Sequence, residues 1–280
     1  MTRPVRWTYA FVDRPAPLFE RAAAFWTAVT DTRPSGLRGE HEEFVTLLPE
    51  GADACVKVQG VAGGDGGAHL DFAVEDVPGF VEEARGLGAE PAAVHDGWAV
   101  LRSPAGHAFC AVPWHGETVR PPVVAGSRLD QVCLDVPPSA FDAEVAFWCA
   151  LLPDWPARPG SRPEFHVVEP PAGLPVRILL QRLDDDRAVD GGGDGGGGDG
   201  GGGDGGGGDG GGGEDAGRPS AHLDLACGAD VDAVRARHER LGARFVARHP
   251  HWTVLRDPAG GLYCLTGRDA ETGGLPRAGS

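Results

Sequence analysis

The sequence predicts an α+β protein of two tandem domains, each built from two βαβββ modules. Three repeated features support this prediction: AFW at 24–26 and 146–148, AHLD at 68–71 and 221–224, and a closing Trp strand, Pro-Ala-Gly turn and Cys in both halves. The spacing between the copies grows from about 122 residues at AFW to about 154 at the closing cysteines, as expected of a repeat with an insertion. The second copy therefore carries an insert.

The insert matches the tract 191–213, which contains only Gly and Asp. Glycine has the most backbone entropy to lose and nothing apolar to bury, so we expect this tract to be disordered. A calcium-binding solenoid would need a regular apolar position in each unit, and the tract has none. We place domain one at 1–114, a linker at 115–126, domain two at 127–268 with the insert at about 184–218, and a flexible tail at 269–280.

Each copy opens with a strand, at Trp7–Val12 and at Gln131–Val136. A helix ending near AFW follows, and in the first copy its apolar residues have helical spacing. Short strands then complete the first module: EFVTLLP and ACVKVQ in domain one, EFHVVEP and VRILLQ in domain two.

The second module of each copy repeats this order. HLDFAV is an alternating strand, and residues 77–87 form a helix with one apolar face, Val77, Phe80, Val81, Ala84 and Leu87. Asp76 and Asp230 are suitable N-caps, and Gly88 and Gly242 suitable C-terminal stops. The Pro-Ala-Gly sequence between two apolar runs then predicts a hairpin closed by a type I turn.

Composition limits the function classes. Ten of the 41 acidic residues fall between 184 and 215, so the rest of the chain is only mildly acidic despite a net charge of −16. The chain has no basic stripe for nucleic acid or anionic membranes, no apolar run long enough to span a bilayer, and no secretory signal. Its six cysteines form no C-x-x-C pair, which favours free thiols and a cytoplasmic location.

The βαβββ order, the AFW helix, the HLDL strand, the LGA after the second helix and the ending W-x-V-L-x-D-P-x-G-x-x-x-C together resemble the vicinal oxygen chelate superfamily. This group contains glyoxalases, bleomycin-resistance proteins and dioxygenases, and the chain is most similar to its actinobacterial glyoxalase-like branch. The resemblance implies that paired modules form a curved mixed sheet, with helices on its convex face and a pocket on its concave face. In many members a divalent metal is held there by His, Gln and Glu.

The resemblance also implies four ligand positions in each domain. His69 and His222 match the histidine of the second module, and Cys110 and Cys264 stand where metal-binding members have Glu. We place the opening-strand ligand at Trp7 in domain one, which offers no ligand atom, and at Gln131 in domain two. The remaining position falls near Val56–Val58 or Leu179–Gln181. Domain two thus keeps a partial ligand set for zinc, iron, manganese or nickel: Gln131, His222 and Cys264.

Strand alternation gives the His-x-Asp pattern an independent interpretation. His69 and Asp71 share one face of their strand, as do His222 and Asp224, while the leucines between them face the helices. These four residues are our pocket candidates, because a histidine beside a carboxylate can act as a general base. The alternative is a hydrogen-bonded pair on a wet sheet face without a ligand. The alternative for Cys110 and Cys264 is that both are buried, inert thiols with no part in a site.

Three functions stay open. The incomplete ligand sets favour a protein that binds a small, partly apolar molecule, with or without metal-independent chemistry, and that uses no cofactor. The second is a metal-dependent lyase, isomerase or dioxygenase centred on domain two. The third is a drug-sequestering or scaffold protein whose pockets do no chemistry. We expect a monomer in which the two copies pair internally, or else a homodimer, with no nucleic-acid or membrane partner.

Overall fold

The computed structural model describes residues 4–184 and 220–275. The expected Gly/Asp insert therefore lies almost entirely outside the described residues, as do residues 276–280 of the expected tail. The tail begins as a turn in which the amide of Asp269 donates to the carbonyl of Gly274. Within the described ranges, no helix has the length and apolarity needed to cross a bilayer.

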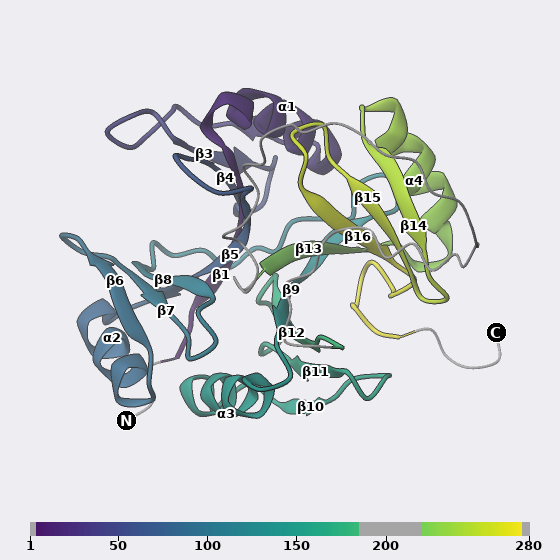
Figure 1. Ribbon diagram of the computed structural model, residues 1–280. Helices are drawn as coiled ribbons and strands as arrows, with labels where there is room; N and C mark the ends of the chain where they lie inside the picture. Colours follow the sequence, from purple (N-terminus) through teal and green to yellow (C-terminus); the bar gives the residue numbers. More distant parts are fainter. Residues whose placement is uncertain (1–3, 185–219, 276–280) are drawn as a thin grey trace, which may run out of the picture.

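The first eight strands form one mixed sheet in the order β2-β3-β4-β1-β5-β8-β7-β6 (Figure 1). The two modules join where β1 and β5 pair antiparallel, with Phe11 opposite His69. Inside each module the opening and closing strands, β1 with β4 and β5 with β8, run parallel. The strand bounds are β1 Trp7–Pro15, β2 Arg33–Pro34, β3 Phe44–Leu48, β4 Val56–Val61, β5 Gly67–Val74, β6 Glu90–Val94, β7 Ala99–Arg102 and β8 Ala108–Pro113.

The second sheet repeats this topology in the order β10-β11-β12-β9-β13-β16-β15-β14. Here β9 and β13 form the central antiparallel pair, with Cys133 opposite His222. Each domain thus builds its sheet from its own two modules. The strand bounds are β9 Arg128–Val136, β10 Ala157–Pro159, β11 Phe165–Val168, β12 Arg177–Arg182, β13 Ser220–Ala226, β14 Arg244–Arg248, β15 Trp252–Arg256 and β16 Leu262–Thr266.

One α-helix packs on each module: α1 (Phe19–Thr30), α2 (Val77–Gly86), α3 (Phe141–Leu151) and α4 (Val231–Arg240). Single 3₁₀ turns, η1 (Ala16–Leu18) and η2 (Gly228–Asp230), precede α1 and α4. These features confirm the predicted α+β fold of tandem βαβββ modules.

The helix ends follow the sequence with two exceptions. Asp76 caps α2 by accepting a hydrogen bond from the amide of Gly79, and Gly88 and Gly242 adopt φ near +105°, which a Cβ disfavours. Asp230, expected to cap α4, makes no side-chain capping bond because the chain enters through η2. Leu87, expected on the buried face of α2, follows the helix and is 37% exposed.

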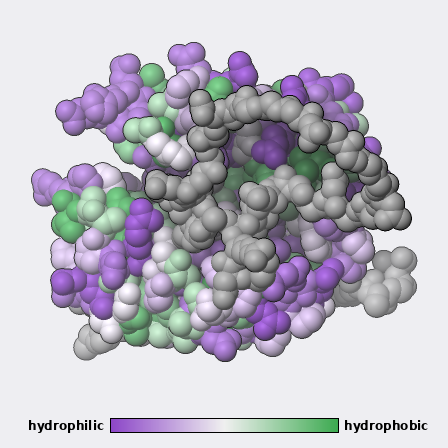
Figure 2. Space-filling model, in the orientation of Figure 1, coloured by the Kyte–Doolittle hydropathy of each residue, from purple (hydrophilic) through white to green (hydrophobic). Residues whose placement is uncertain are grey.

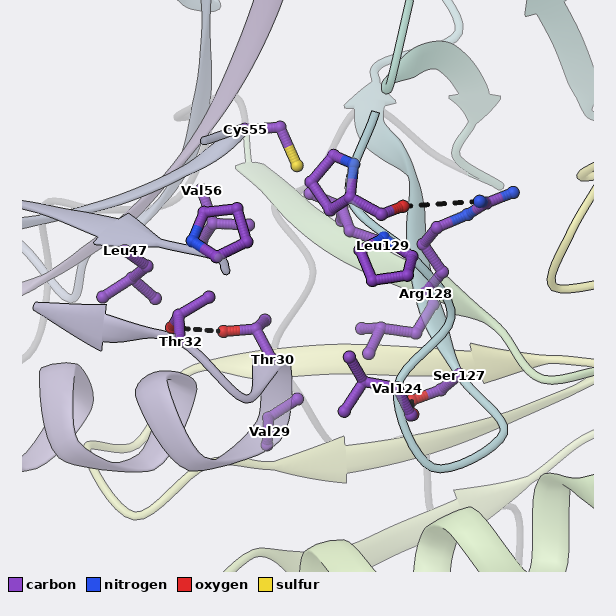
Figure 3. Close-up of a pocket in the computed structure, with 14 residues that line it drawn as sticks. Val29, Thr30, Thr32, Leu47, Cys55, Val56, Val124, Ser127, Arg128 and Leu129 are labelled. Atoms are coloured by element: carbon purple, nitrogen blue, oxygen red, sulfur yellow. Dashed lines mark hydrogen bonds between the residues drawn. The ribbon is translucent and has the colours of Figure 1, made fainter. Parts of the chain in front are cut away.

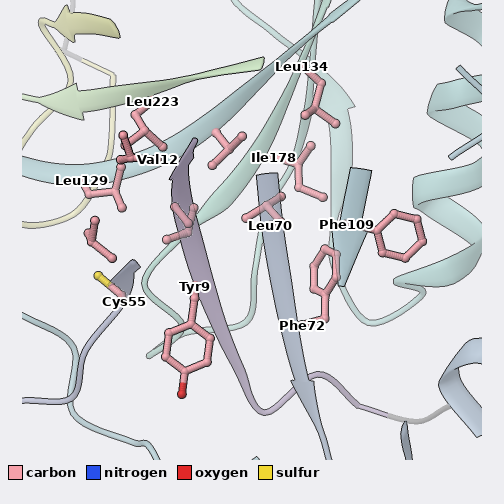
Figure 4. Packing of buried hydrophobic residues seen from close by; sticks show 14 of the residues in the cluster. Tyr9, Val12, Cys55, Leu70, Phe72, Phe109, Leu129, Leu134, Ile178 and Leu223 are labelled. Carbon is pink, nitrogen blue, oxygen red and sulfur yellow. The ribbon is translucent and has the colours of Figure 1, made fainter. Parts of the chain in front are cut away.

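The hydrophobic core is continuous between the two domains. One cluster of buried side chains contains residues of both sheets, and Figure 4 shows Val12 and Leu70 of the first sheet near Leu129 and Leu223 of the second. Helix α1 contributes Phe25 and Trp26, whose rings lie 5.9 and 5.1 Å from that of Tyr263 in β16. The helices therefore stabilise the contact between the domains as well as their own sheets.

Candidate functional site

The two His-x-Asp strands place their polar side chains on the sheet face opposite the core. Leu70 and Phe72 of β5, and Leu223 and Leu225 of β13, are buried in the core cluster. The four pocket candidates point to the other face and form two separate clusters, one in each domain. His69 and Asp71 lie in the first, and His222 and Asp224 in the second.

In domain two, β9, β13 and β16 bring the predicted residues together. Gln131 Nε2 donates to Asp224 Oδ2 over 2.6 Å, and His222 Nε2 lies 3.4 Å from Asp224 Oδ1. Strand register places Cys264 directly beside Asp224. The ligand atoms of His222, Asp224 and Cys264 all lie within 4.8 Å of one another.

Two oxygen atoms of this cluster are left unpaired. Gln131 Oε1 and Asp224 Oδ1 are buried and accept no hydrogen bond from the described residues, because the 3.4 Å contact with His222 lacks hydrogen-bond geometry. Buried polar atoms normally have partners, since an unpaired buried acceptor costs about 1–3 kcal/mol. Both atoms are suited to a donor or a cation that the described part of the chain does not supply.

His222 also contacts a second carboxylate. Its Nδ1 lies 3.5 Å from Asp135 Oδ2, and the Ser220 hydroxyl donates to that oxygen over 2.7 Å. Burial lowers the pKa of His222, but the groups that face it, Asp135 among them, outweigh burial and raise the pKa well above the usual value. Burial raises the pKa of Asp224. The nearby His222 and the hydrogen bond from Gln131 lower it by less, so the pKa stays above its usual value.

Cys264 is not arranged as a nucleophile. Burial and then the neighbouring Asp224 raise the pKa of its thiol to about 11. A thiolate is the reactive form of cysteine, so little of it exists near neutral pH. The thiol is therefore suited to an inert role and not to nucleophilic chemistry. Its sulfur atom could still bind a soft metal ion.

A cleft opens over the domain-two cluster. Its empty space, counted out to the open mouth, is about 650 Å³. Gln131, His222, Asp224 and Cys264 belong to its lining, and Phe165, Val167, Leu179, Trp252 and Leu275 supply its apolar walls. The ring centroids of Phe165 and Trp252 lie 5.9 Å apart in an edge-to-face arrangement. Figure 2 shows hydrophilic and hydrophobic residues interspersed over the visible face of the described residues.

The domain-one cluster is arranged differently. His69 Nδ1 contacts Asp13 Oδ2 at 2.6 Å, and the Lys57 ammonium donates to Asp71 Oδ2 over 2.9 Å. The same ammonium lies 3.8 Å from the ring centre of Tyr9. Burial lowers the pKa of His69, but Asp13 and Asp71 outweigh it and raise the pKa.

The structure corrects one ligand position. Gln131 pairs with Asp224, and the residue that pairs with Asp71 in domain one is Tyr9, so Tyr9 and not Trp7 is the equivalent of Gln131. Trp7 is buried, and its indole donates to the carbonyl of Ala54. Strand register also identifies the remaining position on β4 and β12. Lys57 lies beside Phe11, and Leu179 lies beside the equivalent Cys133, so Lys57 and Leu179 correspond.

Sequence reasoning missed three contributors: Lys57, and the carboxylates of Asp13 and Asp135 that face the histidines. A signal for Lys57 was available, because it is the only lysine in the chain. The two aspartates also occupy equivalent positions in the opening strands, Asp13 beside His69 and Asp135 near His222. Their contribution depends on cross-strand register, which the sequence does not display.

A second hollow lies between the domains, where α1, β3 and β4 meet the linker and β9 (Figure 3). Its empty space is about 440 Å³ and its walls are mostly apolar. The hydroxyls of Thr30 and Thr32 bond to each other over 2.9 Å. None of the four pocket candidates lines it, so it is separate from both clusters.

Comparison with known proteins identifies the family. A family model described as a glyoxalase-like domain matches residues 9–112 and 131–266, most of the 280-residue chain. The chain belongs to the glyoxalase-like domain family. This confirms the resemblance to the vicinal oxygen chelate superfamily. A search of curated protein sequences finds no match.

Solved structures show the same fold at low sequence identity. An extradiol ring-cleaving dioxygenase from B. fuscum has a TM-score of 0.59 and 12% identity, over 96% of this chain and 73% of that one. A Mn(II)-bound glyoxalase from Novosphingobium aromaticivorans has a TM-score of 0.57 and 14% identity, over 99% and 89%. A mutant 4-hydroxymandelate synthase from Streptomyces coelicolor has a TM-score of 0.56 and 16% identity, over 94% and 93%.

The two clusters differ in their fit to a metal ion. Both domains offer nitrogen, oxygen and sulfur donors within reach of one point and two unpaired buried oxygens, which in domain one belong to Asp13 and Asp71. In domain two this donor set suits zinc or a similar divalent ion. Domain one does not fit, because the Lys57 ammonium already holds Asp71 and would repel a metal ion. The expectation of no cofactor gains no support, since one similar structure is a metal-bound glyoxalase.

Proposed function

We propose that this glyoxalase-like protein binds a small, partly apolar molecule in the domain-two cleft. The unpaired acceptors Gln131 Oε1 and Asp224 Oδ1 beneath an open, partly aromatic cleft carry the proposal. Ligand sites typically combine apolar walls with a few convergent polar groups. In domain one, Tyr9, Phe11 and Lys57 crowd the equivalent cluster, which serves as a structural copy.

His222 gives the cleft the means for proton transfer. It lies between the carboxylates of Asp135 and Asp224, and both favour the protonated form of its ring. It is therefore suited to donate a hydrogen bond or a proton to a bound oxygen or nitrogen atom. The proposal assigns His222 and Asp224 to ligand contact, while His69 and Asp71 maintain the structure of domain one.

A thermal-shift screen of small molecules against two matched variants tests this proposal. Trp252→Leu removes an aromatic wall of the cleft, and Trp98→Leu removes the equivalent tryptophan of domain one, which stacks on His95 at 3.9 Å. We expect compounds that stabilise the wild type and Trp98→Leu but not Trp252→Leu. Compounds that stabilise all three proteins equally would contradict the proposed site.

A metal-dependent reaction at the same cluster is the second candidate, supported by the 4.8 Å grouping of His222, Asp224 and Cys264. Gln131, His222 and Cys264 would hold the ion, with Asp224 beside them. A divalent ion bound there would supply a Lewis acid for polarising an oxygen of the substrate. Asp224, beside the ion, would balance part of its charge.

Elemental analysis separates the two candidates. Protein purified without chelator or metal-affinity resin, and its His222→Ala variant, are analysed for zinc, iron, manganese and nickel. About one equivalent of metal that is lost in the variant would support the metal-dependent reaction. A wild type that stays metal-free after incubation with excess ion would support metal-independent binding. The proposal further specifies a monomer, whose domains share one core, and no nucleic-acid or membrane partner.

A further inference from the structure

The two clusters are built alike except at one charged position. Domain one contains Asp13, His69, Asp71 and Cys110. Register places Asp135, His222, Asp224 and Cys264 at the equivalent positions of domain two. The exception is on the strand beside them, where Lys57 in β4 corresponds to Leu179 in β12.

The charges differ accordingly. In domain one the two aspartates face a histidine and an ammonium group, and Lys57 Nζ lies 2.9 Å from Asp71 Oδ2. In domain two the only described group with a positive charge that the equivalent Asp135 and Asp224 face is a histidine. Asp224 Oδ2, the counterpart of the oxygen that Lys57 holds, accepts instead from the neutral Gln131 amide. Domain two thus has one positive charge fewer over the same carboxylates.

The basic side chains that line the cleft do not restore this charge. Arg268 Nε donates to Asp130 Oδ2 over 2.7 Å, and Arg158 Nη2 donates to Glu169 Oε2 over 3.1 Å. Each is already bonded to a carboxylate other than Asp224. Two buried carboxylates that share one histidine keep part of their charge uncompensated, which is costly, so a cation entering the cleft would relieve this cost.

The residues around Leu179 also differ from those around Lys57, and the difference leaves room for the charged group of a ligand. In domain one the Lys57 ammonium lies over the rings of Tyr9 and Phe11, at 3.8 and 5.1 Å from their centres. In domain two these positions are Gln131 and Cys133, and Gln131 offers the unpaired Oε1 as an additional acceptor. Leu179 is shorter than lysine and lines the cleft, so the space that the lysine amine takes in domain one faces the cleft in domain two.

From this comparison we infer that the domain-two cleft takes the protonated amine of an organic ligand, with its ammonium at Asp224 and Gln131 and its apolar part against Phe165 and Trp252. Domain one carries the same interaction permanently through Lys57, the only lysine of the chain. The inference rests on the proposed function and names its ligand class, a primary amine with a small apolar or aromatic group.

Calorimetric titration with 2-phenylethylamine and 2-phenylethanol tests the inference, because the two probes share a shape and differ in charge. A charge-assisted hydrogen bond to a buried carboxylate should favour the amine by about tenfold or more in Kd. Asp224→Asn removes the charge and keeps the side-chain shape, so the amine and the alcohol should then bind within about threefold of each other. A titration with zinc chloride alone shows whether a metal ion takes the position instead.

Leu179→Lys provides a second, independent test. It places in domain two the cation that domain one already has, so binding of 2-phenylethylamine should weaken by about tenfold or more. Val94→Lys adds the same charge at a residue of domain one that is 71% exposed and should leave binding unchanged. Far-UV circular dichroism and Tm establish that Leu179→Lys is folded, and if it is not, Asp224→Asn decides the question.

Three results would overturn the inference: equal affinity of the wild type for amine and alcohol, a preference for the amine that survives Asp224→Asn, or zinc binding that excludes the amine. If both probes bind equally and Trp252→Leu loses both, the proposed cleft stands and only the amine assignment fails. If neither probe binds, the amine assignment fails, and the wider compound screen still decides the proposed function.

Discussion

Arg14 and Asp257 form a buried ion pair between the two domains, although 243 positions separate them in the chain. Arg14 Nη2 lies 2.7 Å from Asp257 Oδ2, and neither side chain is more than 2% exposed. Asp257 also accepts from the Trp26 indole and from the amides of Ala259 and Gly261. The AFW helix of domain one is thus bonded to the Asp-Pro-Ala-Gly turn of domain two.

A second contact joins helix α3 of domain two to the Pro-Ala-Gly turn of domain one, and it uses different residues. In domain two the acid is Glu144 of α3, which accepts from Trp148 Nε1 over 2.8 Å and from the amide of Ala105 in the Pro-Ala-Gly turn of domain one. His107 completes this contact, with Nδ1 3.2 Å from Glu144 Oε1. The two contacts between the domains are therefore not interchangeable.

Gly261→Ala should destabilise the protein. A Cβ at this position would lie 1.8 Å from Arg14 Cζ, and overpacking a core typically costs about 1–3 kcal/mol. Chemical denaturation measures the effect. Gly86→Ala is the control, because a Cβ added to this residue of α2 would meet no atom within 4 Å, and it should leave stability unchanged or slightly higher. Equal stability of Gly261→Ala and wild type would contradict the tight contact.

Arg14→Met should cost about 3–5 kcal/mol of unfolding free energy, because it leaves the buried Asp257 carboxylate without its counter-charge. Arg248→Met is the matched control. Arg248 and Asp232 form an exposed pair at 2.7 Å, and such surface pairs contribute about 1 kcal/mol or less. Urea denaturation of both variants checks the difference, and similar losses in the two would count against the interface.

His238 should make stability depend on pH. Burial, and then Arg237, lower the pKa of His238 from 6.5 to about 4. The unfolded chain takes up this proton first as the pH falls, so stability is fully present above pH 6.5 and declines toward pH 4, by about 3 kcal/mol. His238→Gln should lack this component in denaturation curves measured between these pH values. An identical slope in variant and wild type would refute the assignment.

Lys57 should resist acylation in the folded protein. Its side chain is 14% exposed, bonded to Asp71 and covered by the Tyr9 ring. Because it is the only lysine of the chain, mass spectrometry after treatment with an acetylating reagent reports on it without overlap from other lysines. We expect no acetyl group on Lys57 before unfolding and full acetylation after unfolding in denaturant. Rapid acetylation of the native protein would show that the domain-one cluster is open.

Much of the fold could be predicted because its signals are local or repeated. Alternation in HLDFAV and HLDL placed the leucines in the core and the His-Asp pairs on the other face, and the helix stops at Gly88 and Gly242 follow from positive φ. Asp230 was a wrong capping prediction because the η2 turn, which no sequence signal marked, changes how the chain enters α4.

The candidate site was predicted in part. Gln131, His222 and Cys264 line one cleft, while their role as ligands stays a prediction. The choice of Trp7 over Tyr9 was wrong because a shift of two residues keeps the side chain on the same strand face, so alternation cannot detect it. The role of Lys57 depends on which strand lies beside β1, a property of topology that no local pattern displays.

Methyl NMR of the protein labelled at leucine and valine, titrated with the compounds found by the screen, tests the central claim most directly. The account predicts that chemical shift changes concentrate on Leu179, Val167 and Leu275, which line the domain-two cleft. Changes concentrated on Val29, Val124 and Leu129, which line the hollow between the domains, would contradict it and place the ligand elsewhere.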